Sequence, residues 1–143
     1  MAGTQQRAKV SQAVPFFRVS DMQASLRFYV DGLGFEIYEK WDHDGTIRWC
    51  WLRRDNVALM LQDLPQENGT TRTLDGTLGL GVSIMFLCDD AIALYRECKA
   101  RGLQPSKPFV GNSMWVTSLR DPDGYRIEFE SRTDAPEGSE LDE

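Results

Sequence analysis

Hydrophobic and polar positions along the chain form one pattern that occurs twice, with an offset of 68 residues. Matched positions keep their residue type: Asp21 with Asp89, Leu26 with Leu94, and Gly34 with Gly102. The β-prone run 57–62 falls on the run 125–130 in the same register. A constant offset of this kind predicts two copies of one supersecondary unit.

Each half predicts a strand, a helix and three further strands. In the first half, strands are expected at 14–19, 35–40, 47–53 and 57–62, with turns at 41–45 and 54–56. Between the first two strands, apolar residues recur at helical spacing from Leu26 to Leu33. Ser20 or Asp21 can cap this helix, and Gly32 and Gly34 can end it.

The second half predicts strands at 82–87, 107–110, 115–119 and 125–130, and a helix from Asp90 to Arg101. Asp121, Pro122, Asp123 and Gly124 form a strong turn between the last two strands. The predicted fold class is therefore α+β, with two tandem βαβββ modules. They form curved mixed sheets around a groove, and their helices lie on the outside.

The domain plan follows from this repeat. A single domain is expected over residues 13–131, with module one at 13–63 and module two at 80–131. The linker 64–79 is rich in glycine and threonine, a composition typical of connections. Residues 1–12 form an N-terminal segment. The acidic residues 132–143 are expected to be a disordered tail.

Alternation along the last strand of each half predicts which side chains pack beneath the helices. One face carries apolar residues: Val57, Leu59 and Leu61 in the first half, and Tyr125, Ile127 and Phe129 in the second. The opposite faces carry Ala58, Met60, Gln62, Arg126, Glu128 and Glu130. This second set is too mixed for a dry core, so we expect it to line a groove that binds a ligand.

Charge and cysteine content narrow the function classes. The formal net charge is −6, but residues 134–143 carry five acidic and no basic residues. The rest of the chain is therefore only mildly acidic. It offers no basic patch for nucleic acid. No stretch approaches the roughly 20 apolar residues of a membrane helix. The three cysteines, Cys50, Cys88 and Cys98, form no CxxC pair. We expect a soluble, cytoplasmic protein with reduced thiols.

Several motifs give the chain a family resemblance. The segments 13–21, 25–29, 32–35 and 119–129 read AVPFFRVSD, SLRFY, GLGF and LRDPDGYRIEF. In this order and spacing they resemble the vicinal oxygen chelate superfamily, in particular its glyoxalase/bleomycin-resistance protein/dioxygenase family. The resemblance spans roughly residues 13–131 and implies the same fold.

The resemblance also implies where a metal would bind. Family enzymes such as glyoxalase I hold a divalent metal with His, Gln or Glu from equivalent strands. The matching positions here are Val14, Met60, Val82 or Ser83, and Glu128. Only Glu128 is a competent ligand, whereas a catalytic metal needs about three. We therefore predict no metal, no cofactor and no catalytic residue.

Metal-free members of the family, the bleomycin-resistance proteins, are homodimers that sequester a drug in grooves shared between subunits. By this resemblance we expect a homodimer that binds an aromatic or cationic small molecule by stacking, with no nucleic-acid or membrane partner. The predicted ligand-binding residues are Phe16, Tyr38, Trp49, Trp51, Met60, Phe109, Trp115 and Glu128.

Alternative interpretations stay open. Any of the tryptophans can instead belong to the core or the dimer interface, and Glu128 can simply pair with Arg18 or Arg126. An enzyme of the lyase, isomerase or dioxygenase kind would use Glu128 as an acid/base, or as a metal ligand with the single histidine, His43. A module with a closed groove would serve only interactions. No GxSxG nucleophile motif or phosphate-binding loop is present.

Overall fold

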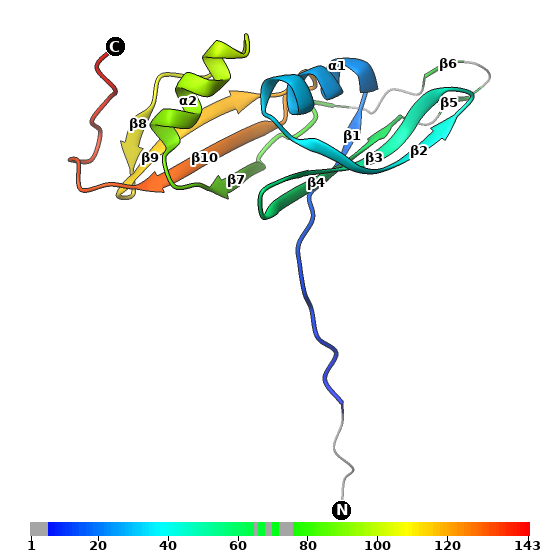
Figure 1. Ribbon diagram of the computed structural model, residues 1–143, viewed down its shortest axis with the longest axis horizontal. Coiled ribbons are helices and arrows are strands. Elements are labelled where there is room, and N and C mark those ends of the chain that lie inside the picture. Colours follow the sequence, from blue (N-terminus) through cyan, green and yellow to red (C-terminus); the bar gives the residue numbers. More distant parts are fainter. Residues whose placement is uncertain (1–5, 65, 68–69, 72–75) are drawn as a thin grey trace, which may run out of the picture.

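Two four-stranded sheets organise the chain, as the repeat predicts. The computed structural model describes residues 6–64, 66–67, 70–71 and 76–143 (Figure 1). Sheet one has the order β1 (Phe16–Val19), β4 (Val57–Asp63), β3 (Thr46–Arg54) and β2 (Glu36–His43). Sheet two has the corresponding order β7 (Ser83–Leu87), β10 (Arg126–Arg132), β9 (Met114–Arg120) and β8 (Phe109–Gly111). The predicted α+β class with two tandem βαβββ modules is confirmed.

Both sheets are mixed in the same way. The β1–β4 and β7–β10 pairs are parallel, and all other neighbours within the two sheets are antiparallel. A parallel neighbour requires a crossover connection, which a helix supplies in each module. Of the predicted linker 64–79, the described part includes the two-stranded pair β5 (Gln66–Glu67) and β6 (Thr70–Thr71), and the rest lies partly outside the described residues.

Each crossover helix begins at an aspartate cap. The Asp21 carboxylate accepts a hydrogen bond from the Ala24 amide (3.1 Å) before α1 (Met22–Leu26), which continues as the π-helical turn η1 (Arg27–Gly32). Asp90 does the same for Ala93 (2.9 Å) before α2 (Ala91–Ala100). The repeat matches Asp21 with Asp89, but the second helix is capped by Asp90, one residue later. No helix in the described part of the chain is long and apolar enough to cross a membrane.

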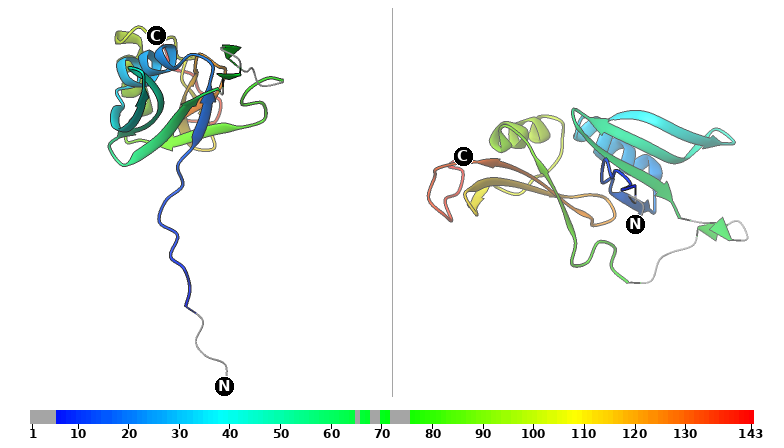
Figure 2. Two further views of the ribbon diagram at one scale, coloured as in Figure 1. Left: turned by 90° about the vertical axis from the view of Figure 1, so that its right-hand side faces the viewer. Right: turned by 90° about the horizontal axis from the view of Figure 1, so that it is seen from below.

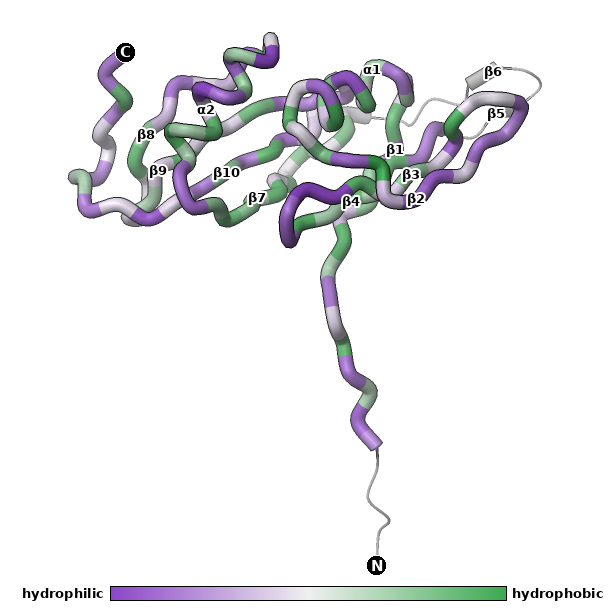
Figure 3. Tube along the Cα trace, viewed as in Figure 1, coloured by the Kyte–Doolittle hydropathy of each residue, from purple (hydrophilic) through white to green (hydrophobic). Residues whose placement is uncertain are grey.

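The hydrophobic core lies between the sheets and these helices. Leu59, Leu61, Ile127 and Phe129 are buried there, on the faces that the alternation predicts. Figure 3 shows hydrophobic and hydrophilic residues alternating along β10. Buried side chains of both modules belong to one cluster, so the modules share a core. In Figure 1 the helices lie above the sheets, and the opposite sheet faces are left without a helical cover.

Polar contacts fix one module against the other. The buried Tyr29 hydroxyl of module one donates a 2.8 Å hydrogen bond to Asp121 Oδ2 in the turn of module two. Burial, followed by the nearby Asp121 charge, raises the pKa of Tyr29, so this hydroxyl keeps its proton. The ring of Tyr125 stacks on Phe17 at 4.3 Å, and its hydroxyl donates to the carbonyl of Arg18. These contacts set how the two sheets sit in the shared core.

Two expectations differ from the structure in the first hairpin and at the C-terminus. A five-residue turn at 41–45 is wrong: β2 runs to His43, and only Asp44 and Gly45, both with positive φ, form the turn. A two-residue turn with this geometry suits the twist of a hairpin. Trp41 is therefore a strand residue, paired with Trp49.

The C-terminal residues, expected to be a disordered tail, lie along β8. Backbone hydrogen bonds join Val110 to Ser139 and Gly138, and Leu141 to Pro108, at 2.8–2.9 Å. Arg96 also pairs with the carboxylate of Glu143. The acidic composition suggested disorder, but the unpaired edge of β8 offers backbone partners that composition does not reveal.

Candidate functional site

The face of sheet one opposite the helices carries an aromatic row. Strand pairing places Phe16 beside Met60, and Met60 beside Trp51, so the three side chains share this face. The next row holds Arg18, Gln62, Trp49 and Trp41. Large apolar side chains stay exposed here: 46% of Phe16 and 56% of Trp41. We call this surface face one.

Tyr38 joins face one through an irregularity in β2. The register between β2 and β3 shifts between Ile37 and Glu39, which leaves Tyr38 as the extra residue of a bulge. Its ring stands edge-on to Trp51 at 5.8 Å, and the Arg53 guanidinium lies 3.7 Å from its centre. The buried Trp51 Nε1–H has no hydrogen-bond acceptor among the described residues. A buried indole N–H normally has a partner, so this donor is left unsatisfied within the single chain.

The corresponding face of sheet two is more acidic. Glu128 lies between Met85 and Ser118, and Glu130 lies between Leu87 and Val116. Phe109 lies beyond Val116 at the far edge of the sheet. We call this surface face two; Met85, Leu87 and Phe109 are 45%, 66% and 39% exposed.

Two carboxylates give face two its charge. Glu128 Oε1 pairs with Arg126 Nε at 2.9 Å, which is one of the two ion pairs expected for this residue. Partial burial, followed by the charge of Glu128, raises the pKa of Glu130. A cation placed against both carboxylates would relieve their mutual repulsion.

Seven of the eight predicted site residues lie on these two faces. Phe16, Tyr38, Trp49, Trp51 and Met60 are on face one, and Phe109 and Glu128 are on face two. The placement of Trp115 in the groove is wrong. Trp115 pairs with Ser131 and Val110, which puts it on the helix side of sheet two, in register with the buried Thr117.

Sequence reasoning missed other residues of the two faces. The sequence pattern places Trp41 in a turn and does not distinguish Met85 and Leu87, although all three lie on strands here. Alternation along β7 was the available signal for the last two, because Ile84 and Phe86 occupy the core side. For Trp41, the Asp-Gly pair at 44–45 was the signal of a tighter hairpin.

The residues at the family's metal-ligand positions do not fit a divalent metal. The register puts Phe16, and not Val14, beside Met60, and it puts Met85, and not Val82 or Ser83, beside Glu128. Phe16 offers no lone pair, and the two thioethers are weak, soft ligands, so a single carboxylate remains for a hard ion. His43 lies at the tip of the β2–β3 hairpin, stacked on Trp41, and is no neighbour of Glu128 in either sheet.

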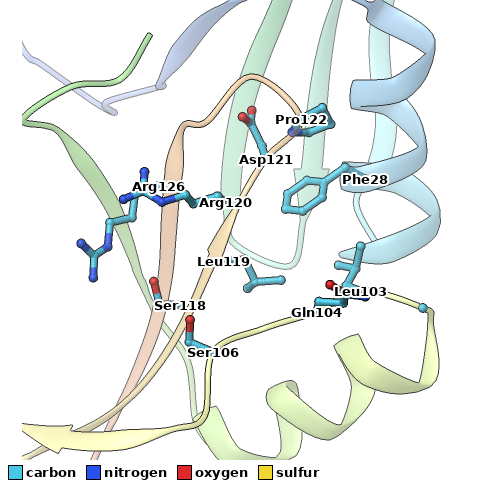
Figure 4. A pocket seen from close by; sticks show the side chains of 11 residues that line it. Phe28, Leu103, Gln104, Ser106, Ser118, Leu119, Arg120, Asp121, Pro122 and Arg126 are labelled. Carbon is cyan, nitrogen blue, oxygen red and sulfur yellow. The ribbon is translucent and has the colours of Figure 1, made fainter. Parts of the chain in front are cut away.

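Faces one and two lie on the same side of the molecule, opposite the helices, and do not close over each other within one chain (Figures 1 and 2). The structure also has two pockets of about 670 and 480 Å³, and the walls of the first include Ser118 and Arg126 from one end of face two. The first is lined by Phe28, Leu103, Arg120 and Arg126 among others (Figure 4), and the second lies between the β3–β4 hairpin and α2. The described part of a single chain therefore presents two open faces, which do not form one closed groove.

The paired βαβββ modules and their uncovered faces define a vicinal oxygen chelate fold. The sequence profile of the Glyoxalase/Bleomycin resistance protein/Dioxygenase superfamily matches residues 10–129, and the chain belongs to this superfamily. The family resemblance seen in the motifs is thereby confirmed.

Similar proteins fall on both functional branches of the superfamily. A probable lactoylglutathione lyase of Vibrio parahaemolyticus is 26% identical over 133 residues, 86% of this chain and 91% of that protein. The bleomycin resistance determinant encoded on the transposon Tn5 has a similar structure, with a TM-score of 0.64 and 24% identity over 88% of this chain and 100% of the other. The bleomycin-binding protein of Streptomyces verticillus, in complex with copper(II)-bleomycin, gives a TM-score of 0.65 and 21% identity over 87% of this chain and 98% of the other. These structures share the fold.

Proposed function

We propose that this protein binds a small aromatic or cationic molecule, without a metal, in grooves of a homodimer. In each groove, face one of one subunit lies opposite face two of its partner. The observation that carries the proposal is the row of Phe16, Met60 and Trp51 on face one, in which Phe16 and Met60 stand where metal-dependent relatives need ligands. Its apolar and polarizable side chains suit stacking and adaptable contact.

Exposure of both faces supports the dimer. Phe16, Trp41, Met85 and Leu87 are each at least 45% exposed, although strands normally bury side chains of this size. Contiguous exposed apolar surface marks sites of association or ligand binding.

The two faces together suggest the chemistry of the ligand. Face one contributes aromatic rings, and face two contributes Glu128 and Glu130. Rings and carboxylates on opposite walls suit a flat molecule with positive charge. A solved bleomycin-binding protein and a solved bleomycin resistance determinant, both with this fold, support such a role. The three free thiols fit the reducing cytoplasm, the location that goes with this proposal.

A pair of matched tryptophan variants tests the proposal. Metal-free bleomycin and a panel of flat cations are titrated into the protein, with tryptophan fluorescence and calorimetry as readouts. Trp51→Leu should weaken binding by about threefold to tenfold, the loss of one stacking contact. Trp115→Leu changes the same residue type on the helix side and should leave affinity unchanged. Equal losses in both variants, or no binding by the wild type, would contradict a ligand site on face one.

A lyase of the glyoxalase kind is the second candidate, favoured by the relative from Vibrio parahaemolyticus. It would use Glu128 as an acid/base or as a metal ligand. Elemental analysis of dialysed protein separates the two functions, because a stoichiometric divalent metal supports the lyase. A Glu128→Gln variant that still binds a ligand but loses activity with a glutathione-derived substrate would also support the lyase. A dimer that binds none of these molecules would instead be an interaction module with a closed groove.

A further inference from the structure

Two arginines meet where sheet two opens toward the Asp121–Gly124 turn. Arg120 on β9 and Arg126 on β10 are direct cross-strand partners, so their side chains leave the same face of the sheet. Like charges directly opposite each other in a sheet are destabilising. A juxtaposition of this kind is relieved by an anion placed between the two guanidinium groups.

Neither guanidinium is fully occupied by the protein. Arg126 contacts Glu128 through Nε, at 2.9 Å from Oε1. Arg120 donates from one terminal nitrogen to the Gly124 carbonyl at 3.1 Å, and no carboxylate in the described part of the chain lies within 4.0 Å of it. Since each guanidinium has five N–H donors, most of them remain free for a ligand.

The same two arginines line two adjoining hollows. One is the pocket of about 670 Å³, whose other walls include the hydroxyls of Ser106 and Ser118 and the apolar side chains of Phe28 and Leu103. Asp121 also lines it, but both oxygens of this carboxylate already accept hydrogen bonds from the protein. Figure 4 shows Arg120 and Arg126 extending to one side of this pocket, away from Phe28 and Leu103. The second hollow, of about 200 Å³, lies between these arginines and the loop from Thr77 to Ser83. The guanidinium groups thus form a wall common to both.

We infer that this pocket binds a small organic oxyanion, a carboxylate or a phosphate ester with an apolar body. Planar guanidinium groups bind the oxygens of such groups in a bidentate manner, and the serine hydroxyls add further donors. Phe28 and Leu103 provide the surface for the carbon skeleton. The volume is within the range of small-molecule sites. All lining residues belong to one chain, so the inference does not require the proposed dimer, although Ser118 and Arg126 also lie at one end of face two.

Calorimetry with four probes tests the chemistry on the full-length protein. Phenyl phosphate and benzoate present the two oxyanions on an apolar ring, inorganic phosphate lacks the ring, and benzyl alcohol lacks the charge. We expect binding of at least one of the first two, at least tenfold weaker binding of inorganic phosphate, and none of benzyl alcohol. The stronger of the first two identifies the oxyanion. Two results would overturn the inference. One is that benzyl alcohol binds as well as the aromatic anions. The other is that neither aromatic anion binds at 10 mM, a concentration on the order of the weakest useful affinities.

Charge-matched variants test the location. Arg120→Gln and Arg126→Gln should each weaken binding of the better probe by about tenfold, the effect of losing one charge-assisted contact. Arg132→Gln removes the same charge from the outer end of β10, on the same sheet face, and should leave binding unchanged. Without a ligand, Arg120→Gln should raise the melting temperature by about one degree, because the repulsion is removed. A loss of binding in Arg132→Gln as large as in the other two would show general charge attraction and overturn the site.

Discussion

Removal of the Tyr29 hydroxyl is the sharpest test of how the modules are held together. This hydroxyl is buried, and it donates to Asp121 Oδ2 across the junction of the two modules. The other oxygen, Oδ1, accepts from the backbone amides of Asp123 and Tyr125 at 2.9 and 2.8 Å. In Tyr29→Phe, therefore, only Oδ2 loses its partner, while the turn itself keeps its hydrogen bonds.

The expected magnitude follows from that geometry. A hydrogen bond to a charged group contributes about 1.5–3 kcal/mol, and the buried Oδ2 of the variant gains no replacement donor from the protein. The phenyl ring is retained, so the packing against Phe28 and Phe35 persists and no cavity of ring size arises. We expect Tyr29→Phe to lower the free energy of unfolding by about 2 kcal/mol at pH 7.

Equilibrium urea unfolding measures this loss, and the chain provides a matched control. Tyr95 on α2 is also buried, but no hydrogen bond of its hydroxyl is found among the described residues. Tyr95→Phe should change stability by less than about 0.5 kcal/mol. The m-value should stay the same in both variants, since neither changes the surface exposed on unfolding. If Tyr29→Phe loses no more than Tyr95→Phe, the junction is held by packing alone.

The pH dependence supplies an independent check. Burial raises the pKa of Asp121, and the Tyr29 hydrogen bond acts against that rise. The wild type therefore has the lower folded-state pKa of the two proteins. The stability advantage of the wild type over Tyr29→Phe is present above these pKa values and shrinks as the pH falls through them. An advantage that stays constant from pH 7 down to acid pH would refute the assigned role of the Asp121 carboxylate.

Three further predictions concern other parts of the chain. Leu87→Asp on face two should dissociate the proposed dimer in sedimentation experiments. Ala93→Asp, on the exposed side of α2, is the control and should leave the dimer intact. A Leu87→Asp protein that is still dimeric would contradict the proposed interface. Burial raises the pKa of all three thiols, to about 11 for Cys50 and Cys98, but Cys88 is only partly buried. Cys88 should therefore react fastest with a disulfide reagent at pH 8, and Cys88→Ser should abolish the fast phase. Truncation after Thr133 removes the backbone partners of the β8 edge and should lower the free energy of unfolding by about 1 kcal/mol. Thermal unfolding measures this loss. An unchanged melting temperature would mean that the C-terminal residues do not stabilise the fold.

The sequence alone determined the architecture. Alternation along 57–62 and 125–130 decided which side chains enter the core, and Leu59, Leu61, Ile127 and Phe129 are buried there. The offset of 68 residues predicted the second sheet from the first. These features are local, because strand periodicity, turn residues and helix caps act over a few neighbouring positions.

Tertiary structure decided which side chains share a face across strands. Both sides of the run 115–119 are mixed in polarity, so alternation within it does not tell which side faces the helices. The register with β10, fixed by the Asp121–Gly124 turn, puts Ser118 beside Glu128 and turns Trp115 to the helix side. The junction between Tyr29 and Asp121, 92 residues apart, and the tail along β8 depend on the same long-range pairing. Sequence periodicity fixes the two sides of a strand, but only pairing with distant strands decides which residues meet on each side.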